Sequence, residues 1–254
     1  VRGLEKTYGA STVVDGIDLN IAPGEFVTIV GPSGCGKSTV LEIVAGLRPS
    51  DGGDVLINDV SLNGPRQETG VIFQENSTLP WRTAIENVAL SLEVRGAAKA
   101  DRLRRSEVAL ATVGLADFAR HYPAQLSGGM KQRVSLARVL TTEPDLILAD
   151  EPFGALDEQT RLMVALELLA IVDRTSASVL FITHSIQEAV LLSDRVLIMS
   201  ARPGRIIDEV VIDIPKPRTT ELIGSSVMNR YTDRIWEPLR REAQRAMEMH
   251  RSSL

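Results

Sequence analysis

The sequence has a single cysteine and no long hydrophobic run. Cys35 has no second cysteine to pair with, which excludes an internal disulfide and fits a reducing compartment. No run of 18 apolar residues occurs, so no bilayer-spanning helix is predicted. The chain does not open with a charged region followed by an apolar run, so no signal peptide is expected. The 28 basic and 33 acidic side chains give a net charge of −5, and we expect no nucleic-acid partner.

The rest of the composition is that of a globular protein, with 44% hydrophobic and 24% charged residues. Short apolar runs at 26–30, 146–149, 179–182 and 196–199 read as buried strands, and helical patterns follow several of them. Near-continuous apolar strands are typical of a parallel sheet covered by helices on both faces. The sequence therefore predicts an α/β protein.

Two segments depart from this alternation. Residues 83–140 contain helical patterns alone, including an amphipathic one at 103–113, which indicates an inserted helical lobe. Beyond a predicted strand at 206–214 and two prolines, the tail shows helix spacing over 228–239, which favours an amphipathic helix packed on the body. Pro238 is expected to interrupt that helix.

A phosphate-binding loop is the strongest motif in the chain. It is predicted between the strand at 26–30 and a helix at 39–47, and its residues are Gly31, Pro32, Ser33, Gly34, Cys35, Gly36, Lys37 and Ser38, with Thr39 beginning the helix. The glycines allow backbone N–H groups to surround phosphate oxygens, and the helix N-terminus favours the anion. Lys37 would reach the β- and γ-phosphates and Ser38 would bind Mg²⁺. Cys35 is either a reactive thiolate or a buried, inert side chain.

Two acidic residues follow the strand at 146–149. Asp150 stands where that strand emerges, and Glu151 comes next. Neighbouring side chains at a strand end point in different directions, so Asp150 is expected to serve the metal and Glu151 the attacking water.

A second glycine motif, LSGGMKQR, covers 126–133. Ser127, Gly128 and Gly129 open a predicted helix, where a hydroxyl and backbone N–H groups would form another phosphate-recognising surface.

With these motifs in this order, the sequence resembles the nucleotide-binding subunit of ABC transporters up to about residue 214. The resemblance implies ATP and Mg²⁺ as cofactors. It implies that Gln74 is the coupling glutamine and a metal ligand, and that Asp157 belongs to a loop communicating between paired subunits. It also implies that His184 contacts the γ-phosphate and that Tyr8 stacks on adenine.

The implied fold is a P-loop NTPase with a RecA-like, mainly parallel core, an N-terminal antiparallel β subdomain and an inserted α-helical subdomain. We expect one ABC ATPase domain over 1–254. Residues 1–73 and 141–215 would form the catalytic core with the β subdomain, 74–140 the helical subdomain, and 216–254 a helical extension.

Three stretches, 74–88, 151–161 and 190–205, resemble the ATPase subunits of nitrate, sulfonate and taurine importers, and importers of riboflavin and pyrimidine precursors share much of this pattern. The expected function is ATP hydrolysis that powers uptake of a small anionic or organosulfur-type solute. The expected partners are a second copy across the nucleotides, a membrane permease and, indirectly, a solute-binding protein. Such a subunit would lie peripherally on the cytoplasmic face of the membrane.

Two other functions compete with transport. One is a soluble ABC ATPase acting on DNA or ribosomes, and the single cassette and short segment 75–126 oppose it. The other is a nucleotide-binding module that no longer hydrolyses ATP, which Glu151 and His184 oppose. Trp81 likewise has two interpretations: it is an anchor for a permease helix, or it packs the helical lobe onto the ATPase core.

Overall fold

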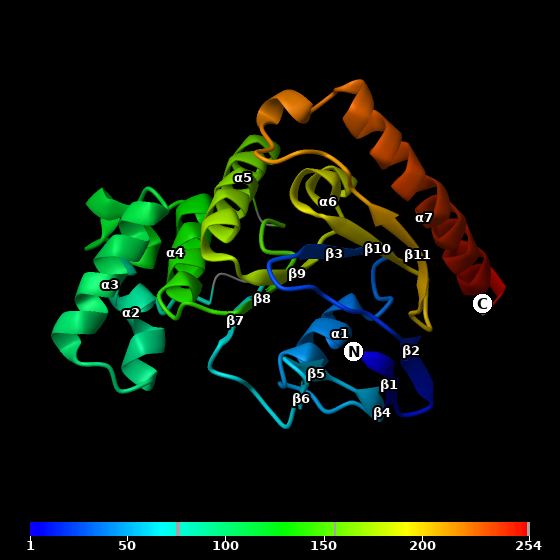
Figure 1. Ribbon diagram of the computed structural model, residues 1–254, viewed down its shortest axis with the longest axis horizontal. Coiled ribbons are helices and arrows are strands. Elements are labelled where there is room, and N and C mark those ends of the chain that lie inside the picture. The colour runs from blue at the N-terminus through cyan, green and yellow to red at the C-terminus, as the bar shows by residue number, and fades with distance from the viewer. Residues whose placement is uncertain (75–76, 155, 253–254) are drawn as a thin grey trace. The chain divides into compact units, whose positions relative to one another are not determined.

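The structure, a computed structural model, describes residues 1–74, 77–154 and 156–252, with side chains described as far as residue 245. The chain forms two compact units, Val1–Arg66 with Ser178–Leu254 (unit 1) and Gln67–Ala177 (unit 2) (Figure 1). Two of the sequence predictions fall partly outside the described residues. They concern the stretch 74–88, at residues 75–76, and the loop before Asp157, at Ala155. The predicted subdomain boundaries at 73, 140 and 215 stay a prediction.

The main strands of unit 1 lie in the order β11-β10-β3-β9. Their bounds are β3 Phe26–Val30, β9 Ser178–Ile182, β10 Arg195–Met199 and β11 Ile206–Val211. β3 pairs in parallel with β9 and with β10, while β11 is antiparallel to β10. All five residues of β3 are buried, as expected for a strand covered on both faces. The predicted strand at 26–30 is confirmed, whereas β11 ends three residues before the predicted 214.

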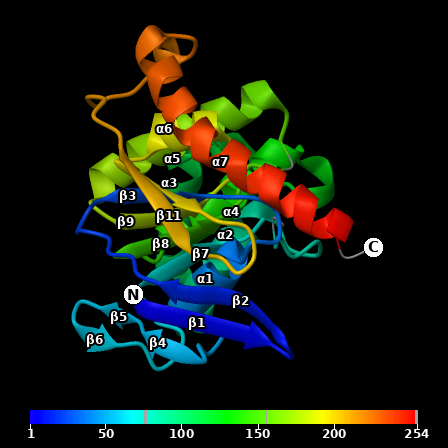
Figure 2. The ribbon, with the colours of Figure 1, turned by 90° about the vertical axis from the view of Figure 1, so that its right-hand side faces the viewer.

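Two helices flank these strands. α1 (Lys37–Val44) packs against β9, and α6 (Ile186–Leu192) packs against β3. The two helices lie on opposite sides of the strands in Figures 1 and 2. α1 ends before the predicted Leu47 because Gly46 turns the chain with φ 72° and lies against Gly64, where a Cβ atom would stand 2.3 Å from the Gly64 carbonyl oxygen.

A separate antiparallel sheet opens unit 1, with strand order β2-β1-β4. Its strands are β1 Arg2–Tyr8, β2 Ser11–Ile17 and β4 Gly52–Asp54, and a two-stranded pair, β5 Leu56–Ile57 with β6 Val60–Ser61, follows. The expected antiparallel β subdomain is therefore present.

Unit 1 ends in a long helix, α7 (Ser226–Ser252), after a short 3₁₀ turn at Thr220–Leu222. α7 packs against α6, β10 and β11, and it buries Met228 and Ile235 completely or nearly so. The predicted interruption at Pro238 is wrong, because the helix continues through this residue. Proline removes one backbone hydrogen bond, to the carbonyl of the exposed Arg234, where water can replace it, while buried side chains on both sides hold the helix.

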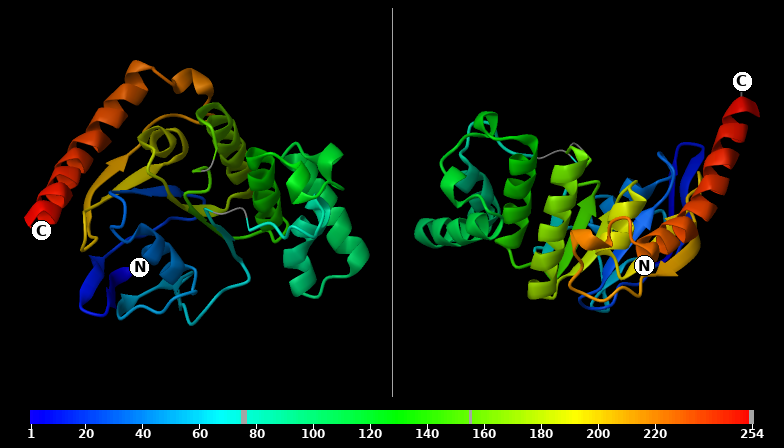
Figure 3. Two further views of the ribbon diagram at one scale, coloured as in Figure 1. Left: turned by 180° about the vertical axis from the view of Figure 1, so that it is seen from behind. Right: turned by 90° about the horizontal axis from the view of Figure 1, so that it is seen from above.

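Unit 2 combines two parallel strands with a helical cluster. β7 (Thr69–Ile72) pairs in parallel with β8 (Leu146–Asp150). The helices are α2 Ala84–Val94, α3 Lys99–Thr112, α4 Gly128–Leu140 and α5 Glu158–Thr175, with 3₁₀ turns at Ala116–Phe118 and Pro123–Gln125. α2, α3 and α4 pack against one another, as Figure 3 shows in blue-green and green, and α4 also packs against α5. The expected helical lobe is present. Among the described residues, no helix is both long and apolar enough to cross a membrane.

Candidate active site

The predicted site residues fall in both units. Unit 1 contains Tyr8, residues 31–39 and His184. Unit 2 contains Gln74, Ser127–Gly129, Asp150, Glu151 and Asp157.

The phosphate loop connects β3 to α1. Two of its glycines have left-handed backbone angles, φ 75° at Gly34 and φ 108° at Gly36, which side-chain-bearing residues rarely adopt. At Gly36 a Cβ atom would also stand 3.0 Å from Val13 Cγ1. Gly36 is the N-cap of α1, no side chain caps this helix, and its first turn contains no acidic residue. The N-terminus of α1 is therefore arranged to receive an anion.

The Lys37 side chain turns back over this loop. It is 6% exposed, and its Nζ donates hydrogen bonds to the carbonyl oxygens of Gly31 at 2.9 Å and Pro32 at 3.0 Å. An ammonium group held by two neutral carbonyls has no counter-charge from them. A phosphate bound by the loop would supply that charge.

Cys35 is buried, with 1% of its surface exposed. Its Sγ lies 3.8 Å from Lys37 Nζ. Burial raises the pKa of the thiol, and the nearby Lys37 ammonium only partly opposes that effect. Of the two interpretations of Cys35, the structure supports the buried one, and its lack of reactivity stays a prediction. The helix N-terminus does not make the thiolate accessible because the side chain points into the protein.

The remaining loop residues lie nearer the surface. Ser33 and Ser38 are exposed, and Pro32 and Thr39 are half-buried. The Tyr8 ring, at the end of β1, is 40% exposed. The Arg48 guanidinium lies 5.3 Å and Lys6 Nζ 5.8 Å from the ring centroid. Tyr8 thus presents an aromatic face in a cationic setting, which suits stacking with a base.

His184 emerges at the same sheet edge as the phosphate loop. β3 and β9 are parallel neighbours with Ile29 opposite Ile182, and Thr183 N donates to the Ile29 carbonyl at 3.4 Å. The turn that carries His184 is braced, since Thr183 Oγ1 donates to Glu188 Oε2 at 2.5 Å. Ser185 Oγ accepts from the Glu188 N–H and caps α6. The structure therefore brings His184 and the phosphate loop to one edge.

In unit 2, β7 and β8 likewise deliver Gln74 and the two acids to one edge. Ile72 lies opposite Ala149. Gln74 Nε2 and Glu151 Oε2 each lie 3.8 Å from the point where a Cβ atom on Gly154 would stand. Glu151 has φ 42°, a left-handed backbone that is unusual for a residue with a side chain and often found at functional sites.

Ser127 and Asp157 both cap helices. Ser127 Oγ accepts from the Met130 N–H at 3.3 Å at the start of α4. Asp157 Oδ1 accepts from the Thr160 N–H at 3.0 Å at the start of α5, and this bond lowers the pKa of the Asp157 carboxyl. Gly128 is exposed, whereas Gly129 is buried, with Thr160 Cγ2 2.8 Å from where its Cβ atom would stand. Ser127 and Gly128 thus form an accessible helix start.

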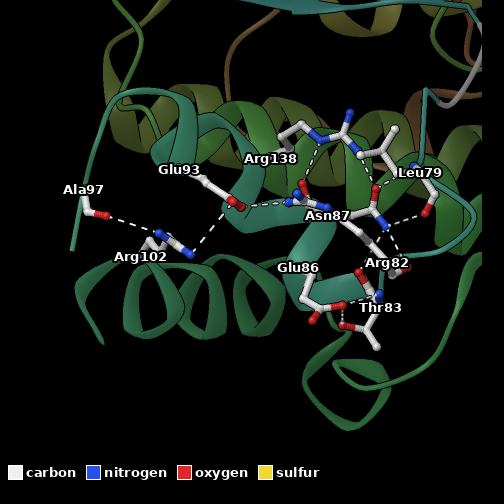
Figure 4. Close-up of polar contacts among 9 residues, drawn as sticks. All are labelled: Leu79, Arg82, Thr83, Glu86, Asn87, Glu93, Ala97, Arg102 and Arg138. Carbon is white, nitrogen blue, oxygen red and sulfur yellow. Dashed lines mark hydrogen bonds and ion pairs between the residues drawn. The ribbon is translucent and has the colours of Figure 1, made fainter. Parts of the chain in front are cut away.

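The segment after Gln74 is held by a buried polar network that the sequence analysis did not single out (Figure 4). Asn87 is 0% exposed and lies at its centre. Its Oδ1 accepts from Leu79 N at 2.7 Å and Arg138 Nη2 at 3.0 Å, and its Nδ2 donates to the Leu79 and Arg82 carbonyls. Arg138 Nε donates to the Asn87 carbonyl at 2.9 Å, and burial lowers the pKa of Arg138. The sequence signal was weak because an Arg in a helix usually faces solvent.

This network leaves Trp81 outside. The side chain is 70% exposed, although Leu79 and Arg82 on either side of it are bonded to Asn87. This exposure contradicts the interpretation that Trp81 is buried in packing the helical lobe onto the ATPase core.

The predicted ligand chemistry suits Mg²⁺. Ser38 offers a hydroxyl, Gln74 an amide oxygen and Asp150 a carboxylate, and Mg²⁺ typically takes one or two carboxylates together with substrate phosphates and water. Within the described parts of the chain, no three His, Cys, Asp or Glu side chains are grouped to hold a metal.

Known proteins match this chain along most of its length. The family described as ABC transporter matches residues 14–154. An uncharacterized ABC transporter ATP-binding protein of Methanocaldococcus jannaschii is 47% identical over 205 residues, 81% of this chain and 77% of that protein. An aliphatic sulfonates import ATP-binding protein of Burkholderia cenocepacia is 46% identical over 218 residues, covering 86% and 79%. A solved dimeric ATP-binding cassette in a post-hydrolysis state, bound to ADP and Pi, has a TM-score of 0.74 and 34% identity over 84% of this chain and 98% of that chain.

Proposed function

This chain belongs to the ABC transporter family as one of its ATPase subunits, and we propose that it powers uptake of a small anionic or organosulfur-type solute through a membrane permease. The observation that carries the nucleotide chemistry is the first turn of α1. It begins at Gly36 without a side-chain cap, while Lys37 Nζ is held over the loop by two carbonyls. Both features favour a bound polyphosphate.

In this proposal residues 31–39 surround the phosphates of ATP, and Tyr8 stacks on the adenine. Mg²⁺, which neutralises developing charge on the phosphates when bound, would be held by Ser38, Asp150 and Gln74. Glu151 accepts a proton from the attacking water, and its neighbour Gln74 helps to position that water. His184 donates to the γ-phosphate from the edge it shares with the phosphate loop.

A second copy completes each site. Ser127, Gly128 and Gly129 of one copy would contact the nucleotide held by the phosphate loop of the other, and Asp157 would connect the two sites. The accessible start of α4 supports this role, and a solved cassette with 33% identity is dimeric. ATP would favour the closed dimer and hydrolysis would release it. ATP would therefore bind the closed dimer more tightly than the open one. This difference in affinity between the two states is the free energy that drives the permease.

The permease would bind beside Trp81. An exposed aromatic ring next to a rigid, hydrogen-bonded segment suits an anchor for a partner helix. Through the permease the subunit would lie peripherally on the cytoplasmic face of the membrane. A solute-binding protein would deliver the solute to the permease at the opposite face.

The solute class is supported by the 46%-identical relative named for aliphatic sulfonate import. Nitrate, sulfonates and taurine are the candidates. The discriminating measurement is ATPase activity of the complete transporter in proteoliposomes, with the solute-binding protein and each solute in turn. Stimulation by riboflavin or a pyrimidine precursor, and by none of the anions, would contradict the solute class.

Glu151→Gln tests the catalytic assignment. The variant keeps the side-chain shape but cannot accept the proton, so we expect kcat for phosphate release to fall by about 10²–10⁴-fold. MgATP binding should remain, and the variant should accumulate as a dimer in ATP because the closed state cannot react. Gln159→Ala, on the exposed first turn of α5, is the control. Near-normal turnover of Glu151→Gln, or no phosphate release by the unmodified protein, would overturn the proposal.

Trp81→Ala tests the permease surface. Because Trp81 is exposed, the free energy of unfolding and the basal ATPase rate should stay near their original values. Binding to the permease should weaken by on the order of 2 kcal/mol, the usual cost of losing a hot-spot aromatic. Trp236→Ala, which removes another exposed tryptophan, on α7, is the matched control. If Trp81→Ala and Trp236→Ala bind the permease equally well, the permease does not bind at Trp81.

A further inference from the structure

The loop between β10 and β11, residues 200–205, lies against the phosphate loop. Gly204 makes the closest approach: a Cβ atom there would stand 2.3 Å from the Cys35 carbonyl oxygen and 2.0 Å from Met199 Cε. Gly204 also bonds to β2, donating its N–H to the Val13 carbonyl at 2.8 Å and accepting from Asp15 N at 3.1 Å. Only a glycine permits this approach, so the loop forms a fixed wall behind residues 34–36.

Arg202 reaches from this wall to the phosphate loop itself. Its Nη2 donates to the Gly34 carbonyl at 3.0 Å. The N–H of the same peptide unit, on Cys35, donates to the Pro32 carbonyl at 3.4 Å. The Gly34–Cys35 peptide is therefore held on both sides. Gly34 has a left-handed backbone and no side chain to fix it, so these two bonds help to set the direction of the neighbouring N–H groups.

The C-terminal helix α7 holds the other end of the wall. Glu242 is 5% exposed, and its Oε2 accepts from the Ala201 N–H at 3.0 Å. Its Oε1 accepts from Arg245 Nη1 at 2.7 Å. A buried carboxylate is costly unless it is hydrogen-bonded, so this contact defines where α7 meets the loop. Ser200 Oγ braces the same loop by donating to the Pro203 carbonyl and accepting from Arg205 N, each at 2.9 Å.

From these contacts we propose that Arg202 is a positioning residue for the phosphate loop, and that α7 keeps Arg202 in place through Glu242. The path runs from Glu242 to the Ala201 N–H, along one peptide to Arg202, and from its guanidinium to Gly34. It lies entirely in unit 1. The inference rests on the proposed assignment of residues 31–39 to the nucleotide phosphates. A loop held in its binding conformation loses less freedom when it binds, so the expected effect is on nucleotide affinity.

The test compares Arg202→Ala, Glu242→Ala and Glu242→Gln in the full-length chain. The control is Arg241→Ala, which removes an exposed arginine of α7 that pairs with Glu237. We measure Kd for MgADP and MgATP, KM and kcat for ATP, and hydrogen exchange of the 31–39 amides without nucleotide. Arg202→Ala should raise Kd and KM about threefold to tenfold, the range expected from the net contribution of one typical hydrogen bond. Its kcat should stay within about twofold, and its loop amides should exchange faster.

Glu242→Ala should change Kd and exchange in the same direction. Glu242→Gln should stay near the original values, because its amide oxygen still accepts from Ala201 N. Unchanged Kd and exchange in Arg202→Ala would overturn the inference, as would equal impairment of Glu242→Gln and Glu242→Ala. If Glu242→Ala does not fold, the measurements on Arg202→Ala and Glu242→Gln test the inference without it. Lys37→Ala separates the two proposals. If it binds nucleotide as tightly as the unmodified protein, the proposed function fails. If its affinity falls while that of Arg202→Ala stays normal, only the positioning role fails.

Discussion

The helices α1 and α4 both begin at glycines, but their first turns are satisfied differently. α1 starts after Gly36 with no side-chain cap and no acidic residue in its first turn, whereas Ser127 Oγ caps α4 from within the same chain. The first arrangement favours a ligand as the acceptor of its N–H groups. In the second, the serine already accepts from one of these N–H groups. The difference teaches that the first turn of α1 is open to a ligand as acceptor, whereas the start of α4 already has an acceptor in its own chain.

The largest test of this comparison is Lys37→Ala. Removing the ammonium removes the charge proposed to hold the β- and γ-phosphates, so MgATP affinity should fall by on the order of 100-fold. Fluorescence titration with a labelled nucleotide measures this. Lys131→Ala in the first turn of α4 is the control, and its affinity as a monomer should be unchanged. Comparable losses in both variants would erase the distinction between the two helix starts.

Nucleotide alone should also stabilise the two regions unequally. MgADP at 100 times its Kd is expected to raise the free energy of unfolding by about 2.7 kcal/mol. At protein concentrations too low for dimers, amide exchange should slow at residues 34–40 and stay unchanged at 128–131. Equal protection of both segments in the monomer would show that the start of α4 also depends on nucleotide.

Ser127→Ala tests the preformed cap of α4. Losing a serine cap costs about 1 kcal/mol of folding stability, and ATPase activity should fall as well if Ser127 contacts nucleotide across the dimer. Ser225→Ala is the matched control, because Ser225 Oγ likewise accepts a backbone N–H, from Met228, at the start of α7. The control should lose similar stability and keep its ATPase activity. A Ser127→Ala protein that loses stability alone would remove Ser127 from the nucleotide site.

The smallest effect concerns Cys35. Because burial raises the pKa of its thiol, alkylation of the folded protein near neutral pH should be much slower than that of the unfolded protein. MgATP should not change the rate appreciably. Cys35→Ala should alter nucleotide affinity by less than about twofold, since the loop binds through its backbone. Fast labelling that MgATP blocks would contradict the buried assignment.

Local sequence predicted the parts of this protein whose physics is local. The apolar run at 26–30 had to be buried on both faces and forms β3. The glycines at 34 and 36 had to allow left-handed backbone angles, and they adopt them. Ser127 is a favourable N-cap residue and caps α4. These outcomes follow from side-chain size, backbone sterics and hydrogen-bonding capacity, which neighbouring residues determine.

What only the tertiary structure decided concerns contacts between distant segments. Pro238 does not end α7, because Met228, Ile235 and Glu242 are buried against the rest of unit 1. Trp81 stays at the surface because Asn87 and Arg138 fill the interior beside it. Cys35 is buried because its side chain turns inward. The bond from Arg202 to Gly34 joins residues 168 positions apart. Nothing in the local pattern around either residue specifies such a pair, since burial and long-range partners are set by the packing of the whole unit.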